Sequence, residues 1–436
     1  MTVPLRRRPP RLLALLVVLA GLAAVLVACG AEPAAPMTVQ GRVALVNGFD
    51  VPLVGVLVHV QGTTTTSDAD GRFSVANVRP PYTVILGSGG SQPWVHAYEG
   101  LTTATPTLSP HAVMDALTSP TAFRRATIAG SLSNPLVANR RIELCAVGLA
   151  GIPAYGCDRI EAGEMTYSIE VAWRDAGPVT VRLYALQYQV DADDRPTAVL
   201  TNGWVDLPVQ DGTTLTQSVP SGTAPVSQAL EGTLLASGGV AGGAFVRVRT
   251  EDAYVLPVYS GNVQAGLLDF EAPLYPDPEI MVSAYALFPV TGGMAFAWSA
   301  VDPTRPFTVS VPVPGQPIEP VDGAAGVDAS TPFRAVGGPA GARNFSWSPQ
   351  LGQNGPDVVL TTMQNEARLP DVSLVGQAWP AGGHYDWVVA AVAAPDLATA
   401  AAFPALGVEF FFATGIGLEG TGAVAVSARR AFDLAP

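Results

Sequence analysis

Three short stretches of similar sequence organise this chain of 436 residues: VQGRV at 39–43, IAGSL at 128–132 and LEGTL at 230–234. Each places a glycine between two apolar positions, and successive copies begin 89 and then 102 residues apart. A period near one hundred residues is long enough for every copy to open a domain with its own core. The sequence therefore predicts repeated domains.

The second and third copies also match farther along, where VRLYAL at 181–186 corresponds to VSAYAL at 282–287. Trp204 and Trp298 follow these stretches, and each copy then reaches a Ser-Val-Pro sequence, at 218–220 and 310–312. We expect the two tryptophans to be equivalent core anchors, with contact to a ligand as the alternative.

The composition favours an all-β protein. The chain has 45 Gly and 39 Pro, is rich in Val, Thr and Ala, and lacks long amphipathic heptads. Such a composition predicts many short strands joined by tight turns. The best helix candidate is 396–403, which starts at an Asp of the N-cap type and stops before Pro404.

The first copy shows a clear strand pattern. Valines alternate at positions 54, 56, 58 and 60, which predicts a strand with one apolar face. Asp70-Gly71 predicts a β-hairpin that returns Phe73 and Val75 to the core, because glycine accepts the positive φ of a tight turn. A calcium loop starting at Asp68 is the alternative, but the later ligands of an EF-hand are absent.

These stretches of the first copy, QGRV at 40–43, PLVGVLV at 52–58, TSDADGRFSV at 66–75 and YTV at 82–84, together resemble the carboxypeptidase regulatory-like domain. The resemblance implies a seven-stranded transthyretin-like β-sandwich for residues 38–110. The later copies, at 127–222 and 228–315, lack the Asp-Gly-x-Phe signature. We interpret them as divergent relatives of the same sandwich.

The pattern changes after residue 316. FSWSP at 345–349 and GHYDWVV at 383–389, with the Pro- and Gly-rich run at 320–333, resemble the fibronectin type III-like domains of bacterial surface proteins. The resemblance implies a fourth β-sandwich over 317–436. Tyr385, Trp387 and Val389 alternate as one face of a central strand should, and residues 403–412 form an insertion.

The N-terminus carries a basic segment with four arginines, then an apolar run from Leu12 that ends at Cys29. This pattern is typical of a secretory signal, and the cysteine that closes it resembles the lipobox of bacterial lipoproteins. The resemblance implies that residues 1–28 are a signal peptide and that Cys29 carries a lipid, followed by a tether over 29–37. An uncleaved membrane anchor is the alternative.

Charge excludes several functions. The chain contains 23 arginines, no lysine and 36 acidic residues. Loss of residues 1–28 removes four arginines and no acid, which leaves 19 against 36 and a net charge of −17. An acidic surface repels phosphate backbones, so we expect no nucleic-acid partner. The lack of lysine also rules out P-loop and Schiff-base lysines.

Cys145 and Cys157 remain once Cys29 is assigned to the lipid. Disulfides persist in exported proteins, so we expect these two residues to be bridged. Two free thiols are the alternative. A metal site is less favoured, because no histidine or third cysteine lies nearby.

The chain has four histidines, the residues most often used in zinc sites: His59, His96, His111 and His384. His96-Ala-Tyr-Glu99 resembles the His-x-x-Glu zinc ligands of metallocarboxypeptidases, but the third histidine at the required distance is missing. We therefore expect His96 to be an ordinary solvent-facing residue and predict no zinc, no other cofactor and no catalytic residue. Trp94 and Tyr98, in a Gly-, Ser- and Pro-rich stretch, are the aromatic residues that we expect to be exposed for ligand contact.

The sequence thus predicts an all-β fold of tandem Ig-like or transthyretin-like β-sandwiches in series, after a cleaved lipoprotein signal peptide. The favoured function is that of a non-catalytic cell-envelope lipoprotein with a structural or adhesive role. Its partners would be the membrane, through the N-terminal lipid, and a glycan or a surface protein. The alternative is a protein that binds carbohydrate or an envelope polymer, and the least favoured is a hydrolase accessory protein.

Overall fold

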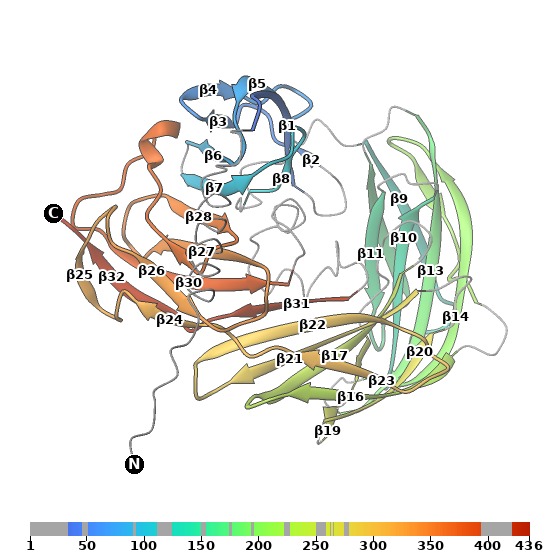
Figure 1. Ribbon diagram of the computed structural model, residues 1–436. Helices are drawn as coiled ribbons and strands as arrows, with labels where there is room; N and C mark the ends of the chain where they lie inside the picture. Colours follow the sequence, from blue (N-terminus) through green and yellow to red (C-terminus); the bar gives the residue numbers. More distant parts are fainter. Residues whose placement is uncertain are drawn as a thin grey trace, which may run out of the picture.

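The computed structural model describes residues 34–45, 51–89, 93–110, 124–149, 154–173, 177–192, 196–221, 227–249, 259–261, 263–264, 266–273, 279–393 and 421–436. Within these ranges the protein is built from β-strands, as predicted, with a single turn of 3₁₀ helix at Val372–Val375 (Figure 1). Cys29, His111 and the segments at 396–403 and 403–412 lie outside the described residues.

The first copy, here called repeat 1 (37–108), is a two-layer sandwich, as predicted. Its strands are β1 (Met37–Leu45), β2 (Val51–Pro52), β3 (Leu57–Val60), β4 (Thr63–Thr66), β5 (Arg72–Val78), β6 (Tyr82–Ser88), β7 (Trp94–Leu101) and β8 (Thr107–Leu108). One layer has the order β5-β1-β8, with β2 also on β1, and the other has the order β4-β3-β6-β7. A core of valines and aromatic residues fills the space between the layers.

Repeat 2 (124–216) follows the same plan. Its strands are β9 (Arg124–Ser131), β10 (Arg140–Gly148), β11 (Tyr155–Ile160), β12 (Thr166–Trp173), β13 (Val179–Val190), β14 (Pro196–Val209) and β15 (Thr214–Thr216). The orders β12-β9-β15 and β11-β10-β13-β14 match the two layers of repeat 1. Here the layers join into one bent sheet, because β11 and β12 pair at Tyr155 and Ala172.

Repeat 3 (227–311) has the same topology again. Its strands are β16 (Ser227–Ala236), β17 (Val240–Arg249), β18 (Tyr259–Gly261), β19 (Val263–Gln264), β20 (Leu267–Pro273), β21 (Glu279–Phe288), β22 (Gly293–Val301) and β23 (Phe307–Val311). The layers are β20-β16-β23 and β18-β17-β21-β22. In all three repeats the first strand pairs antiparallel on one side and parallel with the closing strand on the other.

The glycine of the repeated stretch has one structural role in every copy. A Cβ atom added to Gly41 would overlap the ring of Phe73, and one added to Gly232 would overlap the ring of Phe307. At Gly130 it would overlap the ring of Tyr167 and the Gln217 carbonyl. In each copy, the lack of a side chain at this glycine therefore lets an aromatic ring from a neighbouring strand pack against the backbone.

The C-terminal module (316–434) is a fourth sandwich. Its strands are β24 (Gln316–Glu319), β25 (Ala324–Val327), β26 (Phe333–Val336), β27 (Ala342–Pro349), β28 (Asp357–Thr362), β29 (Glu366–Ala367), β30 (His384–Val392), β31 (Thr421–Val426) and β32 (Arg430–Leu434). One layer is β24-β26-β29, and the other contains β28, β27, β30 and β32. Phe333 packs edge-on against Trp347 and Trp387, and Tyr385, Trp387 and Val389 are all buried, as the alternation predicts.

Three of these modules share one sheet, which the interpretation as sandwiches in series did not foresee. Strand β28 of the C-terminal module pairs in parallel with β7, and β31 pairs with both β22 and β30. The result is a 14-stranded sheet that runs from β18 of repeat 3 to β4 of repeat 1. Its course from β17 through β31 and β28 to β4 can be followed in Figure 1. Repeat 2 keeps its own sheet and packs on repeat 3 through Leu186, Tyr188 and Val190.

Two details of repeat 1 correct the sequence prediction. Asp70-Gly71 does form a tight turn, with Gly71 at φ 72° and its N–H donating to the Asp68 carbonyl. The flanking strands β4 and β5 nevertheless belong to different layers, so the expected hairpin is wrong. Val54 lies before β3, which begins at Leu57, and is 62% exposed, whereas Val56, Val58 and Val60 are buried.

Candidate functional site

Trp94 and Tyr98, the predicted ligand contacts, are 3% and 0% exposed. Both lie on β7, which has β6 on one side and β28 on the other, and both belong to the core of repeat 1. The Gly-, Ser- and Pro-rich composition that suggested exposure belongs to the connection before the strand. The expectation that these two residues line a surface site is therefore wrong.

His96, expected to face solvent, is 1% exposed. Its Nε2 lies 2.8 Å from Oγ1 of Thr361 on β28, and its Nδ1 lies 3.3 Å from the hydroxyl of Tyr98. Tyr98 in turn donates to the Ser109 carbonyl at 2.8 Å. His96 thus belongs to a buried polar network between repeat 1 and the C-terminal module, while Glu99 is exposed. Across the described part of the chain, no three His, Cys, Asp or Glu side chains gather to hold a metal ion.

Trp204 and Trp298 differ in burial. They lie on the corresponding strands β14 and β22, but Trp204 pairs with Tyr184 whereas Trp298 pairs with Ser283. Phe296, opposite Tyr285, is the true counterpart of Trp204. Trp298 is 3% exposed and is a core anchor, whereas Trp204 is 42% exposed. The predicted equivalence is therefore wrong by two positions.

Repeat 1 carries a groove with a volume of about 660 Å³. It lies where the β4 edge of one layer approaches β5 and β1 of the other. Its lining residues are Gln40, Gly41, Arg42, Thr65, Thr66, Asp68, Arg72, Phe73, Ser74 and Thr105. Phe73 is almost fully buried, and the polar groups that the groove offers are hydroxyls, an amide, two guanidinium groups and a carboxylate, beside apolar surface of similar extent.

The charged groups of this groove are fixed by the turn before β5. Asp68 accepts the backbone N–H groups of Asp70 and Arg72 through Oδ1, at 2.9 and 2.8 Å. Arg42 donates to the Asp70 carbonyl, and Arg72 pairs with the Asp70 carboxylate at 3.2 Å. Asp70 lies outside the lining but pairs with Arg72, so the two arginines are balanced by Asp68 and Asp70, and the groove suits an uncharged, hydroxyl-rich ligand. The motif at 66–75 signals this turn in the sequence, but its use as a groove wall depends on the other layer.

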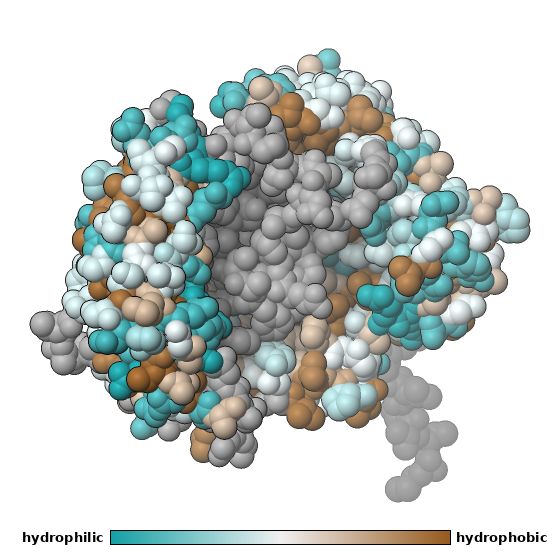
Figure 2. Space-filling view, turned by 180° about the vertical axis from the view of Figure 1, so that it is seen from behind, coloured by the Kyte–Doolittle hydropathy of each residue, from teal (hydrophilic) through white to brown (hydrophobic). Residues whose placement is uncertain are grey.

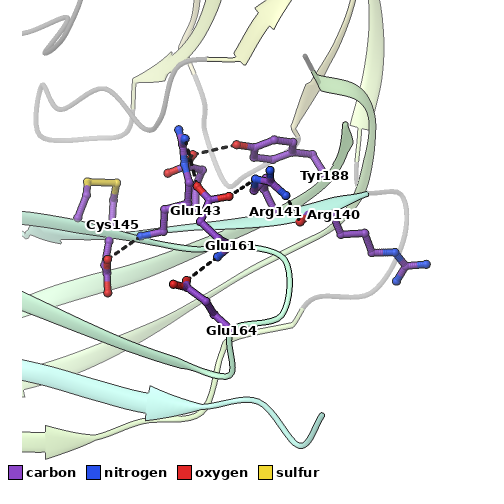
Figure 3. Close-up of polar contacts among 10 residues, drawn as sticks. Arg140, Arg141, Glu143, Cys145, Glu161, Glu164 and Tyr188 are labelled. Atoms are coloured by element: carbon purple, nitrogen blue, oxygen red, sulfur yellow. Dashed lines mark hydrogen bonds and ion pairs between the residues drawn. A yellow bond between two sulfur atoms is a disulfide. The ribbon is translucent and has the colours of Figure 1, made fainter. Parts of the chain in front are cut away.

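A second polar cluster lies on repeat 2, beside the disulfide (Figure 3). The predicted bond between Cys145 and Cys157 is present, and it links β10 to β11. Glu143, two residues before Cys145, pairs with Arg159 and accepts the Tyr188 hydroxyl at 2.9 Å. Burial raises the pKa of the Glu143 carboxyl, against the attraction of Arg159 and the Tyr188 hydrogen bond.

The Glu143 cluster is a structural junction. Tyr188 also packs into the core of repeat 3, so the hydrogen bond to Glu143 ties the two repeats together. Arg141 pairs with Glu161, whose carboxylate is also 3.7 Å from Arg159. Every charge of the cluster is thus paired within it. Sequence reasoning missed Glu143, because one acid at an alternating strand position usually marks a solvent-facing side.

Outside the groove and the Glu143 cluster, polar and apolar residues are mixed on the surface. On the face shown in Figure 2, apolar residues form small separate patches among polar ones. Such scattered exposure is normal for folded proteins and does not mark a site. No helix in the described ranges is long and apolar enough to cross a membrane.

No known protein family matches the chain, and no curated protein is significantly similar to it. A leucine-rich repeat protein from Bacteroides thetaiotaomicron is 11% identical, with a TM-score of 0.17, over 44% of this chain and 26% of its own. The Bacillus anthracis TIE protein is 10% identical, with a TM-score of 0.14, over 63% and 50%. The pilus adhesin SpaC from Lactobacillus rhamnosus GG is 14% identical, with a TM-score of 0.13, over 77% and 44%. The chain spans half or less of each, and scores this low establish no shared fold.

Proposed function

We propose that this protein is a non-catalytic scaffold of the bacterial cell envelope, with a structural or adhesive role. The observation that carries the proposal is the 14-stranded sheet, in which backbone hydrogen bonds pass from repeat 3 through the C-terminal module to repeat 1. A shared sheet fixes the modules relative to one another, as a load-transmitting or displaying surface requires. The buried histidine and the paired acids described above support a structural use of the polar residues.

The envelope location rests on the N-terminal sequence, with Cys29 as the lipid-bearing residue. Cys29→Ala, expressed in a bacterial host, should accumulate unprocessed and incorporate no labelled fatty acid. The matched control is Cys157→Ala, which should keep the label. Equal labelling of the Cys29→Ala variant and the wild type would contradict the anchor.

The scaffold itself is tested by ending the chain after Gly420, which removes β31 and β32. Strand β31 pairs with β22 of repeat 3 and β30 of the C-terminal module, so both modules should lose several kcal/mol, a large share of a domain's stability. Hydrogen exchange measured by mass spectrometry should show both losing protection together, while β9 to β12 of repeat 2 stay protected. Full protection of β21 and β22 in the truncated protein would show that the modules behave independently.

Carbohydrate or envelope-polymer binding is the second candidate, favoured by the groove of repeat 1. Its hydroxyl, amide and guanidinium groups are those that bind sugar hydroxyls. A glycan array probed with the protein should give signals that Arg72→Ala and Thr66→Ala reduce about tenfold, the cost of one or two lost hydrogen bonds. Thr216→Ala, on β15 of repeat 2, is the control. No signal above background for the wild type would eliminate this candidate.

A further inference from the structure

Strand β4 ends the 14-stranded sheet and pairs only with β3 among the described residues. The two strands are joined by the two-residue turn Gln61-Gly62, with φ values of 44° and 86°. Such a turn is closed by a hydrogen-bonded pair, here Val60 and Thr63. The Ser67 N–H bond to the Val56 carbonyl follows the same alternation. The backbone groups of Thr64 and Thr66 therefore point away from β3, toward the open edge.

This edge lacks the features that usually prevent pairing between chains. Edge strands are normally protected by charges, prolines or bulges. The edge strand β14 contains Pro196, Asp206 and Pro208, and β24 contains Pro317 and Glu319. Strand β4 consists of Thr63, Thr64, Thr65 and Thr66, with neither charge nor proline, and three of these four residues are exposed. Figure 1 places β4 at the outer rim of repeat 1.

A strand of four threonines is complementary to itself. In a two-fold symmetric dimer each residue faces a residue of the same strand in the other copy, so a strand with charges of one sign would oppose like charge. In the register that sets Thr64 opposite Thr66, Thr65 faces its own copy, so threonine faces threonine at all three positions, which is a favourable cross-strand pair. The chain carries a net charge of −13, which becomes −17 without residues 1–28. Two copies therefore repel each other overall. The four residues of β4 carry no charge, and the two arginines and two aspartates beside them balance, so two copies can approach at this edge.

We propose that the β4 edge pairs antiparallel with β4 of a second copy of this chain, so that two 14-stranded sheets join across a two-fold axis. The chain already joins its own modules by pairing of strand edges, in parallel between β7 and β28 and antiparallel between β22 and β31. Four residues bury much less surface than the ~1,200 Å² of a stable dimer. The dimer is therefore reversible and depends on protein concentration.

Sedimentation of the purified protein over a range of concentrations tests this pairing. The wild type should pass from monomer to dimer. The double variant Thr64→Glu/Thr66→Glu places glutamates opposite each other and should weaken association at least about tenfold. Thr64→Arg/Thr66→Arg should do the same, and an equimolar mixture of the two variants should dimerise again, because each glutamate then faces an arginine.

The control is Thr214→Glu/Thr216→Glu, which makes the same change on the exposed strand β15 and should leave association unchanged. Both β4 variants lose the hydrogen bond between Thr64 and His59, so a local folding defect would affect them equally and would persist in the mixture. A wild type that stays monomeric, a dimer that tolerates the glutamates, or a mixture that fails to associate would each overturn the proposal.

Discussion

Repeats 1 and 2 have the same strand order, yet they are held in place differently. In repeat 1, the outer strand β7 continues into the C-terminal module through β28. The corresponding strand of repeat 2, β14, ends its sheet. Repeat 2 instead carries the disulfide and the buried Glu143 cluster. Repeat 1 is thus held to its neighbour by backbone pairing between strands. Repeat 2 is held instead by a disulfide within the repeat and by side-chain contacts with repeat 3.

The largest expected effect tests the cross-link of repeat 2. Replacing both Cys145 and Cys157 by alanine should lower the free energy of unfolding of this repeat by about 3 kcal/mol, the chain-entropy value for a loop of this length. Urea unfolding and hydrogen exchange measure the change. Repeat 1 should keep its protection in the same experiment. A loss spread equally over both repeats would show that the disulfide serves the whole assembly.

The glycines of the repeated stretch should differ in how much stability the protein loses when each is replaced by alanine. In Gly130→Ala the new Cβ meets the Gln217 carbonyl, part of the backbone, as well as the Tyr167 ring. In Gly41→Ala it meets only the end of the Phe73 ring, a side chain that can shift more readily than the backbone. Overpacking costs about 1–3 kcal/mol, and we expect Gly130→Ala at the upper end and Gly41→Ala at the lower end. Equal losses in thermal or urea unfolding would contradict this difference.

Substitution of His96 tests the boundary between β7 of repeat 1 and β28 of the C-terminal module. His96→Ala removes the partner of the buried Thr361 hydroxyl, so we expect a loss of about 1–2 kcal/mol. His59→Ala is the matched control, since His59 is half-buried on β3 and bonds only within repeat 1. That variant should change the free energy of unfolding by no more than about 0.5 kcal/mol. Similar losses for the two variants would argue against a special role of the β7–β28 boundary.

The sequence was sufficient for the fold class because alternation and turn residues are local signals. The strands around Phe73 and Trp387, the turn at Gly71 and the disulfide all follow from residues close together in the chain. The placement of Trp94, Tyr98 and His96 did not, because their burial depends on β28, more than two hundred residues away. The groove depends likewise on two layers that meet only after folding. Contacts of long sequence separation leave no periodic trace in the segments that make them.

The smallest expected effect concerns Glu143 and pH. Because burial raises its pKa in the folded state, that state binds the proton more tightly than the unfolded chain does. The resulting stability is present below the ordinary glutamate pKa and is lost as pH rises through the raised value. Glu143→Gln never ionises and still accepts the Tyr188 hydroxyl, while Arg159 is exposed enough to be solvated alone. Relative to wild type, the variant should therefore gain stability as pH rises, and at neutral pH it should lie within about 1 kcal/mol of wild type or above it. Urea unfolding at a series of pH values measures this difference, and a variant that becomes relatively weaker toward neutral pH would show that the Arg159 pair outweighs burial.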